Sequence, residues 1–500
     1  MTGYSLSDKK HKKPMKKLIN IIFVGLIFMA GCTDLDDVLY DRIPEDAYTA
    51  DPVLRMSPIY RPMQDHLDWG GWWFAQELTG DGVVCPIRGE HWIDDFKWVE
   101  LHKHDWHYET EAVQAMWGRF YEGVTAANRF IEEQNAFAGD PVVDQAIAKA
   151  RILRSYYYYL LIDNYGDVPF ITNFMDAPER PFKDPRDEIF WAIVEDMEES
   201  VLLLEPQTSK TAVTPGMAYS LLAKLYLNAE VYTGVSDDTY WQKAEQYADS
   251  VLAMGYALEA DALGPFVTAN QESPENIWVI PYHEDTYHGF NLHMRTLHYQ
   301  SNRTFNMNVG PWNGFAALED HFNNYEENDR RRDGFLYGEQ FSHTGEALDV
   351  FLDPNIPALE MAPGSFPEDV IEMAGARVIK FEVKNGAREN LGNHFPIFRL
   401  GDIILMKAEA LIRQNGDGAG DDYVNMIRQR AGLDPWNNVD LDMLLDERSR
   451  EMFWEGHRRQ DLIRFGKFGN EWWEKAASGP DRETFPIPQW AIESNPNLAN

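Results

Sequence analysis

The sequence predicts an all-α fold of successive antiparallel helix pairs, with long loops and minor β-strands on one face. Apolar residues recur every three or four positions through the first half of the chain and again after residue 400, and helix breakers separate these runs. The region from about 255 to 398 lacks long runs of that period. With 44% hydrophobic and 13% aromatic residues, the 500-residue chain can bury a large core.

Five amphipathic helices are predicted in the first half. Gly166 ends the second of them, while Asp184-Pro185 and Thr214-Pro215 each predict a capped helix start with a proline in the first turn. Short successive helices with Ala and Tyr at close-packing positions resemble tetratricopeptide repeats, although their spacing is irregular. The apolar stripes run over residues 113–131, 147–161, 190–204, 218–229 and 241–251.

The region from about 255 to 398 is rich in Gly, Pro, Asn and aromatic residues, which predicts long loops. Only short extended runs interrupt them, at 277–281 and 376–382. Loops of this length in a compact domain usually carry function. Three further helices are predicted at about 400–413, 421–431 and 441–455.

The N-terminus is typical of an exported lipoprotein. Six lysines precede an apolar run from Leu18 to Ala30, which is too short to span a bilayer and fits a secretory signal. The sequence from Phe28 to Cys32 resembles a bacterial lipobox, in which the cysteine is diacylated and becomes the new N-terminus. The alternative is a soluble signal that ends near a cysteine by chance. Translation from Met15 would give a signal peptide of more ordinary length, with residues 1–14 as an extension before the true start. Met1 and Met15 are therefore alternative start sites.

The net charge of −36 argues against nucleic acids and anionic lipid surfaces as ligands, because both would be repelled. Neutral or cationic partners remain. Cys32 and Cys85 are the only cysteines, so no disulfide framework or cysteine metal site can be built.

Tryptophans gather between His66 and Tyr108, with Arg88, Asp94 and Asp95 among them. Indole rings stack on the apolar faces of pyranose rings, while Arg and carboxylate groups hydrogen-bond hydroxyls, so this mixture suits a neutral polysaccharide. Tryptophan is also highly buried on average, so we expect most of these rings to be core. A second aromatic loop lies between residues 282 and 312.

Two other clusters invite a catalytic or metal interpretation. His102, His104 and His107 are close in sequence, but no helical i, i+4 pair supports a metal site. Glu447, Glu451 and Glu455 lie four residues apart among several arginines. This pattern favours a solvated or ion-paired helix face over a catalytic acid/base pair. No hydrolase, metalloprotease, P-loop or dinucleotide motif is present, and we predict no metal, no cofactor and no enzymatic activity.

Seven motifs follow one another along the chain: WVELHKHDW at 98–106, YGDVPF at 165–170, GPWNGF at 310–315, DRRR at 329–332, RLGDIILMKAEA at 399–410, ERSREMFWEGHRRQDL at 447–462 and FPIP at 485–488. Their order resembles that of the SusD/RagB family of outer-membrane nutrient-binding lipoproteins, and the resemblance covers the chain from Cys32 to Asn500.

The resemblance implies an all-α, tetratricopeptide-like scaffold with residues 1–31 as the lipoprotein signal peptide. It implies an N-terminal part at 32–260 and a loop-rich ligand face with the C-terminal helices at 261–500, packed as one domain. The implied function is non-catalytic binding of polysaccharide or oligosaccharide at the cell surface and delivery to a SusC-like TonB-dependent transporter. The protein would be anchored to the outer membrane through lipidated Cys32 and would face the cell exterior.

The resemblance carries over the location of ligand binding but not the contact residues. Relatives often read Gly-Gly-Asp-Trp where this chain has Gly89-Glu-His-Trp92, so a usual polar contact is changed at His91. We therefore predict stacking residues and hydroxyl partners from the two aromatic loops. The stacking candidates are Trp92, Trp98, Tyr299 and Trp312, and the hydroxyl partners are Arg88 and Asp95.

Two alternatives remain open from the sequence. A peptide-import subtype of the same family would bind oligopeptides in place of oligosaccharides. An acidic, Trp-rich, helical lipoprotein could also be an α/α-toroid glycoside hydrolase or lyase, whose catalytic carboxylates leave no short motif.

Overall fold

A computed structural model describes residues 52–69, 71–206 and 209–499. Residues Pro52–Asn500 form one compact unit. The predicted signal peptide, Cys32 and the two alternative start sites lie outside the described residues. Across the described part of the chain, no helix combines the length and the hydropathy needed to cross a lipid bilayer.

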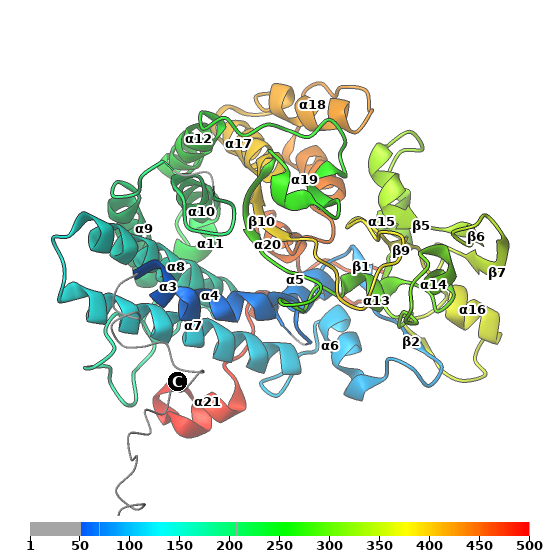
Figure 1. Cartoon of the computed structure of the whole chain (residues 1–500), viewed down its shortest axis with the longest axis horizontal. Coiled ribbons are helices and arrows are strands. Elements are labelled where there is room, and N and C mark those ends of the chain that lie inside the picture. Colours follow the sequence, from blue (N-terminus) through cyan, green and yellow to red (C-terminus); the bar gives the residue numbers. More distant parts are fainter. Residues whose placement is uncertain (1–51, 70, 207–208, 500) are drawn as a thin grey trace, which may run out of the picture. The chain divides into compact units, whose positions relative to one another are not determined.

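The predicted helix pairs form one half of this unit (Figure 1). Helix α7 packs against α8, α8 against α9, α10 against α12 and α12 against α17. All five predicted N-terminal helices and the three C-terminal ones are present, which confirms the all-α fold class. Their bounds are α7 Glu111–Asn135, α8 Pro141–Tyr165, α9 Arg186–Val201, α10 Pro215–Leu227, α12 Asp238–Leu252, α17 Leu400–Asn415, α18 Asp421–Arg430 and α19 Leu441–Glu451. A short helix that was not predicted, α11 Ala229–Thr233, follows α10.

The close contact between α7 and α8 explains the small and aromatic residues of the sequence pattern. A Cβ atom on Gly123 of α7 would lie 2.2 Å from the ring of Tyr157 on α8, so only glycine lets the two helices approach this closely. The side chain of Asp140 caps α8 by accepting a hydrogen bond from Val142 N–H, and Gly166 ends it with φ of 74°. The inward faces of α7 and α8 thus contribute many of the buried side chains of the core.

Two predicted helix ends were wrong. Thr214 caps α10 as predicted, but Asp184 does not cap α9; its carboxylate accepts instead from Phe170 N–H at 2.7 Å. Helix α19 ends at Glu451 rather than near residue 455, because Trp454 and Gly456 adopt left-handed φ angles of 69° and 79°.

The loop-rich half contains short strand pairs, as predicted. Strand β3 (Asn276–Ile280) pairs antiparallel with β10 (Phe395–Arg399) and joins this half to the start of α17. Figure 1 shows β5, β6, β7 and α16 at the opposite side from α7–α12. The other strands are β1 Val83–Val84 with β4 Ala316–Ala317, β2 Ile87–Arg88 with β8 Glu360–Met361, β5 Phe335–Leu336 with β9 Arg377–Val378, and β6 Gly338–Phe341 with β7 Ala347–Leu352.

Several short helices were not predicted. Two of them, α5 and α6, lie within the Trp-rich segment that the sequence indicated only as an aromatic loop. Seven residues are too few for an apolar stripe to stand out. The short helices are α3 Pro52–Arg55, α4 Ser57–Tyr60, α5 Trp72–Leu78, α6 Lys97–Lys103, α13 Leu292–Thr296, α14 Ser301–Thr304, α15 Glu319–Asn323, α16 Glu368–Met373, α20 Arg458–Arg464 and α21 Gln489–Ser494.

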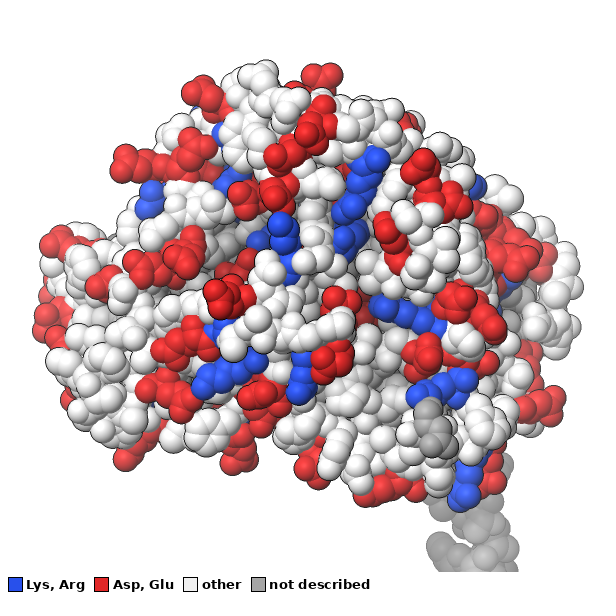
Figure 2. Space-filling model, turned by 180° about the vertical axis from the view of Figure 1, so that it is seen from behind, with Lys and Arg blue, Asp and Glu red and all other residues white. Residues whose placement is uncertain are grey.

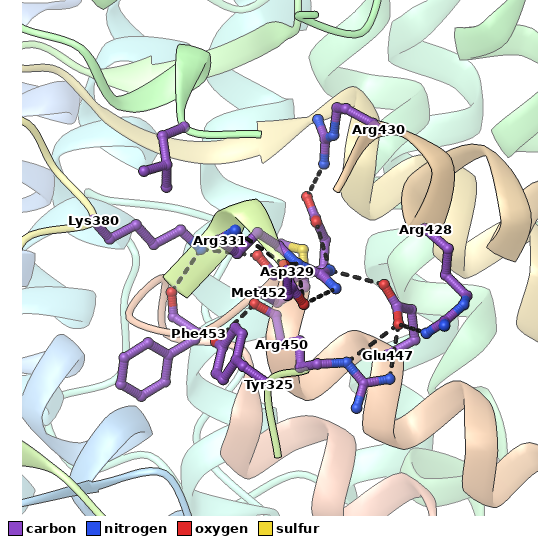
Figure 3. Close-up of polar contacts among 12 residues, drawn as sticks. Tyr325, Asp329, Arg331, Lys380, Arg428, Arg430, Glu447, Arg450, Met452 and Phe453 are labelled. Carbon is purple, nitrogen blue, oxygen red and sulfur yellow. Dashed lines mark hydrogen bonds and ion pairs between the residues drawn. The ribbon is translucent and has the colours of Figure 1, made fainter. Parts of the chain in front are cut away.

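The C-terminal carboxylates form a buried ion-pair network (Figure 3). Glu447 of α19 binds Arg331 at 2.8 Å and Arg450 at 2.8 Å, and Glu451 binds Arg399 at 2.7 Å. Every one of these side chains is at most 5% exposed. The ion-paired alternative for this face is therefore confirmed, and the solvated alternative is wrong. The network joins α18, α19 and the segment around residue 331.

Candidate functional site

Four tryptophans from separate segments converge at the surface beside α5. The ring centroid of Trp69 lies 6.1 Å from that of Trp92, 6.0 Å from Trp98 and 5.4 Å from Trp312. Trp69 is 37% exposed, Trp92 and Trp312 are partly buried, and Trp98 is buried. We call these four residues the tryptophan cluster.

The motif at 310–315 holds Trp92 and Trp312 together. Trp92 Nε1 donates a hydrogen bond to the Trp312 carbonyl at 2.9 Å. A Cβ atom on Gly314 would lie 2.4 Å from the Trp92 ring, so this glycine lets the indole lie directly on the backbone. The Trp312 N–H donates to the Met294 carbonyl at 2.6 Å, which anchors the loop to α13.

The loop between Trp92 and Trp98 has a strained backbone. Trp92, Asp94, Asp95 and Phe96 all have positive φ angles, between 36° and 64°. Non-glycine residues in this region cost about 1 to 2 kcal/mol each, and such strain concentrates at binding and catalytic sites. The Asp94 carboxylate helps to hold the conformation by accepting from Trp98 Nε1 at 2.7 Å. Phe96 is left 47% exposed beside the cluster.

Two predicted site residues lie beneath the surface rather than on it. Trp98 is 1% exposed and packs against the rings of Trp69 and Trp92. Arg88 is 2% exposed, and its guanidinium donates to the carbonyls of Gly314, Ile371 and Ala374. Burial lowers the pKa of Arg88 to about 10. This arrangement differs from the predicted hydroxyl contact, because all three of these bonds hold loops behind the cluster.

Tyr299 and Asp95 lie at the edge of the site. The half-buried Tyr299 ring packs edge-on against exposed His91, with 6.3 Å between centroids. Burial, together with the Glu372 carboxylate, raises the pKa of Tyr299, so its hydroxyl stays protonated at neutral pH. The carboxylate of Asp95 is exposed and forms no hydrogen bond or ion pair within the described ranges. Both side chains can therefore meet a ligand.

Sequence reasoning did not include Trp69 among the stacking candidates. Its only sequence signal is the Gly70-Gly71 pair that follows, which predicts a turn at the surface. The buried guanidinium of Arg295 lies 4.5 Å from the Trp69 ring centroid and donates to the Leu67 carbonyl at 2.7 Å. Burial lowers the pKa of Arg295 to about 9. The cation–π contact fixes the ring that the cluster exposes most.

An open cleft of about 470 Å³ adjoins the cluster, between residues 65–69 and 71–72 on one side and helix α7 on the other. Trp69 belongs to both the cleft and the cluster. Flat aromatic faces beside carboxylate, amide and guanidinium groups suit stacking with a sugar and hydrogen bonding to its hydroxyls.

The predicted histidine cluster has structural partners. His102 Nε2 contacts the Trp473 carbonyl at 2.8 Å, and His104 Nε2 contacts the Thr79 carbonyl at 2.9 Å. Burial lowers their pKa values to about 4 and about 3, so both rings are neutral. His107 pairs with Glu100 at 3.5 Å. Within residues that the structure describes, no three His, Cys, Asp or Glu side chains are grouped to hold a metal ion.

Two family models match this chain. Residues 374–500, which contain Arg399, Glu447, Arg450 and Glu451 of the buried network, match the model described as "SusD family". Residues 87–227, which contain Trp92 and Trp98, match the model described as "Starch-binding associating with outer membrane". Together the matches cover more than half of the chain.

Similar proteins agree with these matches. The starch-binding protein SusD of Bacteroides thetaiotaomicron is 26% identical over 464 residues, covering 82% of this chain and 81% of that protein. A SusD-like protein of Bacteroides ovatus is 24% identical, covering 92% of this chain and 86% of that protein.

Solved structures share the fold. Surface glycan-binding protein A from Bacteroides thetaiotaomicron, in complex with laminarihexaose, has a TM-score of 0.72 and 20% identity, covering 89% of this chain and 98% of that one. A SusD superfamily protein from Parabacteroides distasonis has a TM-score of 0.73 and 19% identity, covering 89% and 97%. The ordered motifs, both family models and the shared fold agree, and the chain belongs to the SusD family.

Proposed function

We propose that this protein is a non-catalytic, cell-surface glycan-binding protein that uses the tryptophan cluster to hold its ligand. The observation that carries the proposal is the convergence of Trp69, Trp92 and Trp312 at one surface, where buried Trp98 packs against the first two rings. Three partly accessible indoles offer a sugar chain several stacking faces, and Asp95 and Tyr299 lie at their edge to meet hydroxyls.

The charge of the molecule favours a neutral glycan over an anionic one. Acidic side chains are spread over the face that Figure 2 shows, with far fewer basic ones between them. A net charge of −36 repels uronates, sulfates and phosphates. The named ligands of its relatives and structural neighbours support the same class, since they include starch, laminarin and a xylogluco-oligosaccharide.

The proposal includes an outer-membrane location and delivery of the glycan to a SusC-like TonB-dependent transporter. The lipobox at Phe28–Cys32 supports a lipid anchor, and one matching family model is described as associating with the outer membrane. A surface binding protein feeds the cell only when its ligand reaches a transporter, so a stable transporter complex is the expected assembly.

An affinity gel tests the function. Wild-type protein is run through native gels that contain laminarin, xyloglucan or amylopectin, with a gel that contains no polysaccharide as the control. We expect retardation by at least one polysaccharide and no release of reducing ends on incubation. Binding of oligopeptides alone in calorimetry would favour the peptide-import subtype, and released reducing ends would favour the hydrolase or lyase. Either result would overturn the proposal.

A further inference from the structure

The cleft beside the tryptophan cluster has the form of a ligand site. Its volume of about 470 Å³ falls within the usual range for small-molecule pockets. One wall comes from Trp69 and from Trp72 at the start of α5, and the other from the face of α7 that carries Gln114 and Gly118.

Gly118 has no structural reason to be glycine. A Cβ atom there would meet nothing within 4 Å, whereas one on Gly123 of the same helix would collide with Tyr157 at 2.2 Å. Glycine in the interior of a helix costs about 1 kcal/mol relative to alanine. Glycine at position 118 does not allow closer helix packing that would offset this cost. Its missing side chain leaves the wall of the cleft flat and the space in front of it open.

The polar groups of the cleft suit a neutral ligand. Arg119 is paired with Asp65 at 2.9 Å and with Glu122 at 3.0 Å, so its charge is already balanced. Asp68 and Gln114 add an exposed carboxylate and an amide to the same cleft. Carboxylates outnumber the single guanidinium of the lining, which disfavours an anion, while hydroxyls can bond to all of these groups.

Trp69 connects the cleft to the cluster. Its ring lies 5.4 Å from that of Trp312 and also lines the cleft, so a chain that stacks on the cluster can continue past Trp69 toward Gly118. We infer that the cleft is a second glycan subsite, which receives further sugar units of the chain held by the tryptophan cluster. This inference rests on the proposed function.

Closing the cleft without touching the cluster tests the inference. Gly118→Leu fills the space with a good helix former that cannot hydrogen-bond a sugar. Thr125→Leu is the matched control, because Thr125 is exposed on the same face of α7, about two turns further on, and lies outside the cleft. The probes are laminaribiose and laminarihexaose, with maltose and maltohexaose in parallel, and binding is measured by calorimetry.

The expected result is a loss of about tenfold in affinity for the hexasaccharide in Gly118→Leu, with unchanged disaccharide affinity and no change in Thr125→Leu. Unchanged hexasaccharide binding, or an equal loss for both lengths, would overturn the second subsite while leaving the proposed function intact. Absence of any glycan binding by folded wild-type protein would instead overturn the proposed function, and this inference with it. If Gly118→Leu does not fold, Gln114→Phe narrows the cleft one turn earlier and must produce the same pattern of losses.

Discussion

Gly314 controls how the indole of Trp92 lies against the loop of Trp312. The Trp92 ring occupies the position that a side chain at residue 314 would need. Trp92 Nε1 also donates a hydrogen bond to the Trp312 carbonyl. A shift of the Trp92 ring therefore also changes the position of the loop that carries Trp312. The cluster therefore depends on a residue that offers no ligand contact of its own.

Gly314→Ala should displace the Trp92 ring, because its Cβ would lie 2.4 Å from it. We expect a loss of roughly 1 to 3 kcal/mol in the free energy of unfolding, together with weaker glycan binding. Gly310→Ala is the control, since a Cβ there meets nothing within 4 Å in the same motif. Chemical denaturation and gel retardation measure both effects. Equal behaviour of the two variants would contradict this account of the cluster.

Single residues were the hardest feature to predict from the sequence. The aromatic composition indicated segments that meet in the structure, and Trp92 and Trp312 lie together in the cluster. It did not distinguish Trp98, which is buried, from Trp69, which is exposed. Exposure is set by how three distant segments meet, and the only local sign of it is the Gly70-Gly71 pair after Trp69. The sequence predicts that Arg88 hydrogen-bonds the hydroxyls of a ligand. In the structure its guanidinium donates instead to the backbone carbonyls of residues 314, 371 and 374.

At the scale of elements, the long helices could be predicted because each carries several turns of apolar residues. Helices α7 and α8 are 25 residues long and end near clear breakers. Helices α5, α6 and α20 have seven residues each, so tertiary contacts rather than periodicity define them. Helix α19 ends before Trp454, whose positive φ of 69° is a backbone conformation that sequence spacing does not reveal.

Helix α19 depends on its buried carboxylates for its place in the fold. Burial alone raises the pKa of Glu451, but the guanidiniums of Arg430, Arg399 and Arg331 outweigh it and hold the pKa well below its usual range. Glu451→Gln leaves those guanidiniums buried with less opposing charge, which should cost about 3 to 5 kcal/mol of the free energy of unfolding. Asp446→Asn on the exposed face of the same helix is the control. Similar urea midpoints for the two variants would show that the network contributes little.

At the scale of the whole molecule, buried neutral histidines make stability depend on pH. Unfolded histidine titrates near pH 6.5, and burial lowers the folded pKa, so the unfolded chain binds more protons below that pH. Stability is therefore full above pH 6.5 and is lost as pH falls, by up to about 1.4 kcal/mol per pH unit for each residue. The folded pKa values are about 3 for His66, His104, His321 and His457, and about 4 for His102, His293 and His298.

We expect the free energy of unfolding in urea to fall steadily from pH 7 to pH 5. Glu77 opposes this trend, because burial raises its pKa to about 7 and the folded state then binds its proton. One such group cannot offset all of the histidines. A high-salt series is the control, because salt screens the change in net charge that acidification also causes. A flat profile between pH 7 and 5 would contradict the neutral state of the buried histidines.

The lipid anchor is a separate property of the whole protein. Two or three acyl chains hold a protein firmly on a membrane at about 0.8 kcal/mol per buried methylene. Cys32→Ser should therefore abolish surface display. Cys85→Ser is the matched control, because Cys85 is fully buried and unpaired. Mass spectrometry of the mature N-terminal peptide is the measurement, and an unmodified peptide that begins elsewhere than Cys32 would rule out lipidation there.

The central claim is that the tryptophan cluster binds glycan. Calorimetric titration of Trp312→Ala with a polysaccharide that retards the wild-type protein tests this claim most directly. Trp490→Ala is the control, because Trp490 is a 46% exposed tryptophan on α21, outside the cluster. The account predicts a loss of roughly 1 to 3 kcal/mol in binding free energy for Trp312→Ala, an unchanged fold, and wild-type affinity for Trp490→Ala. Equal, undiminished affinity in both variants would contradict it.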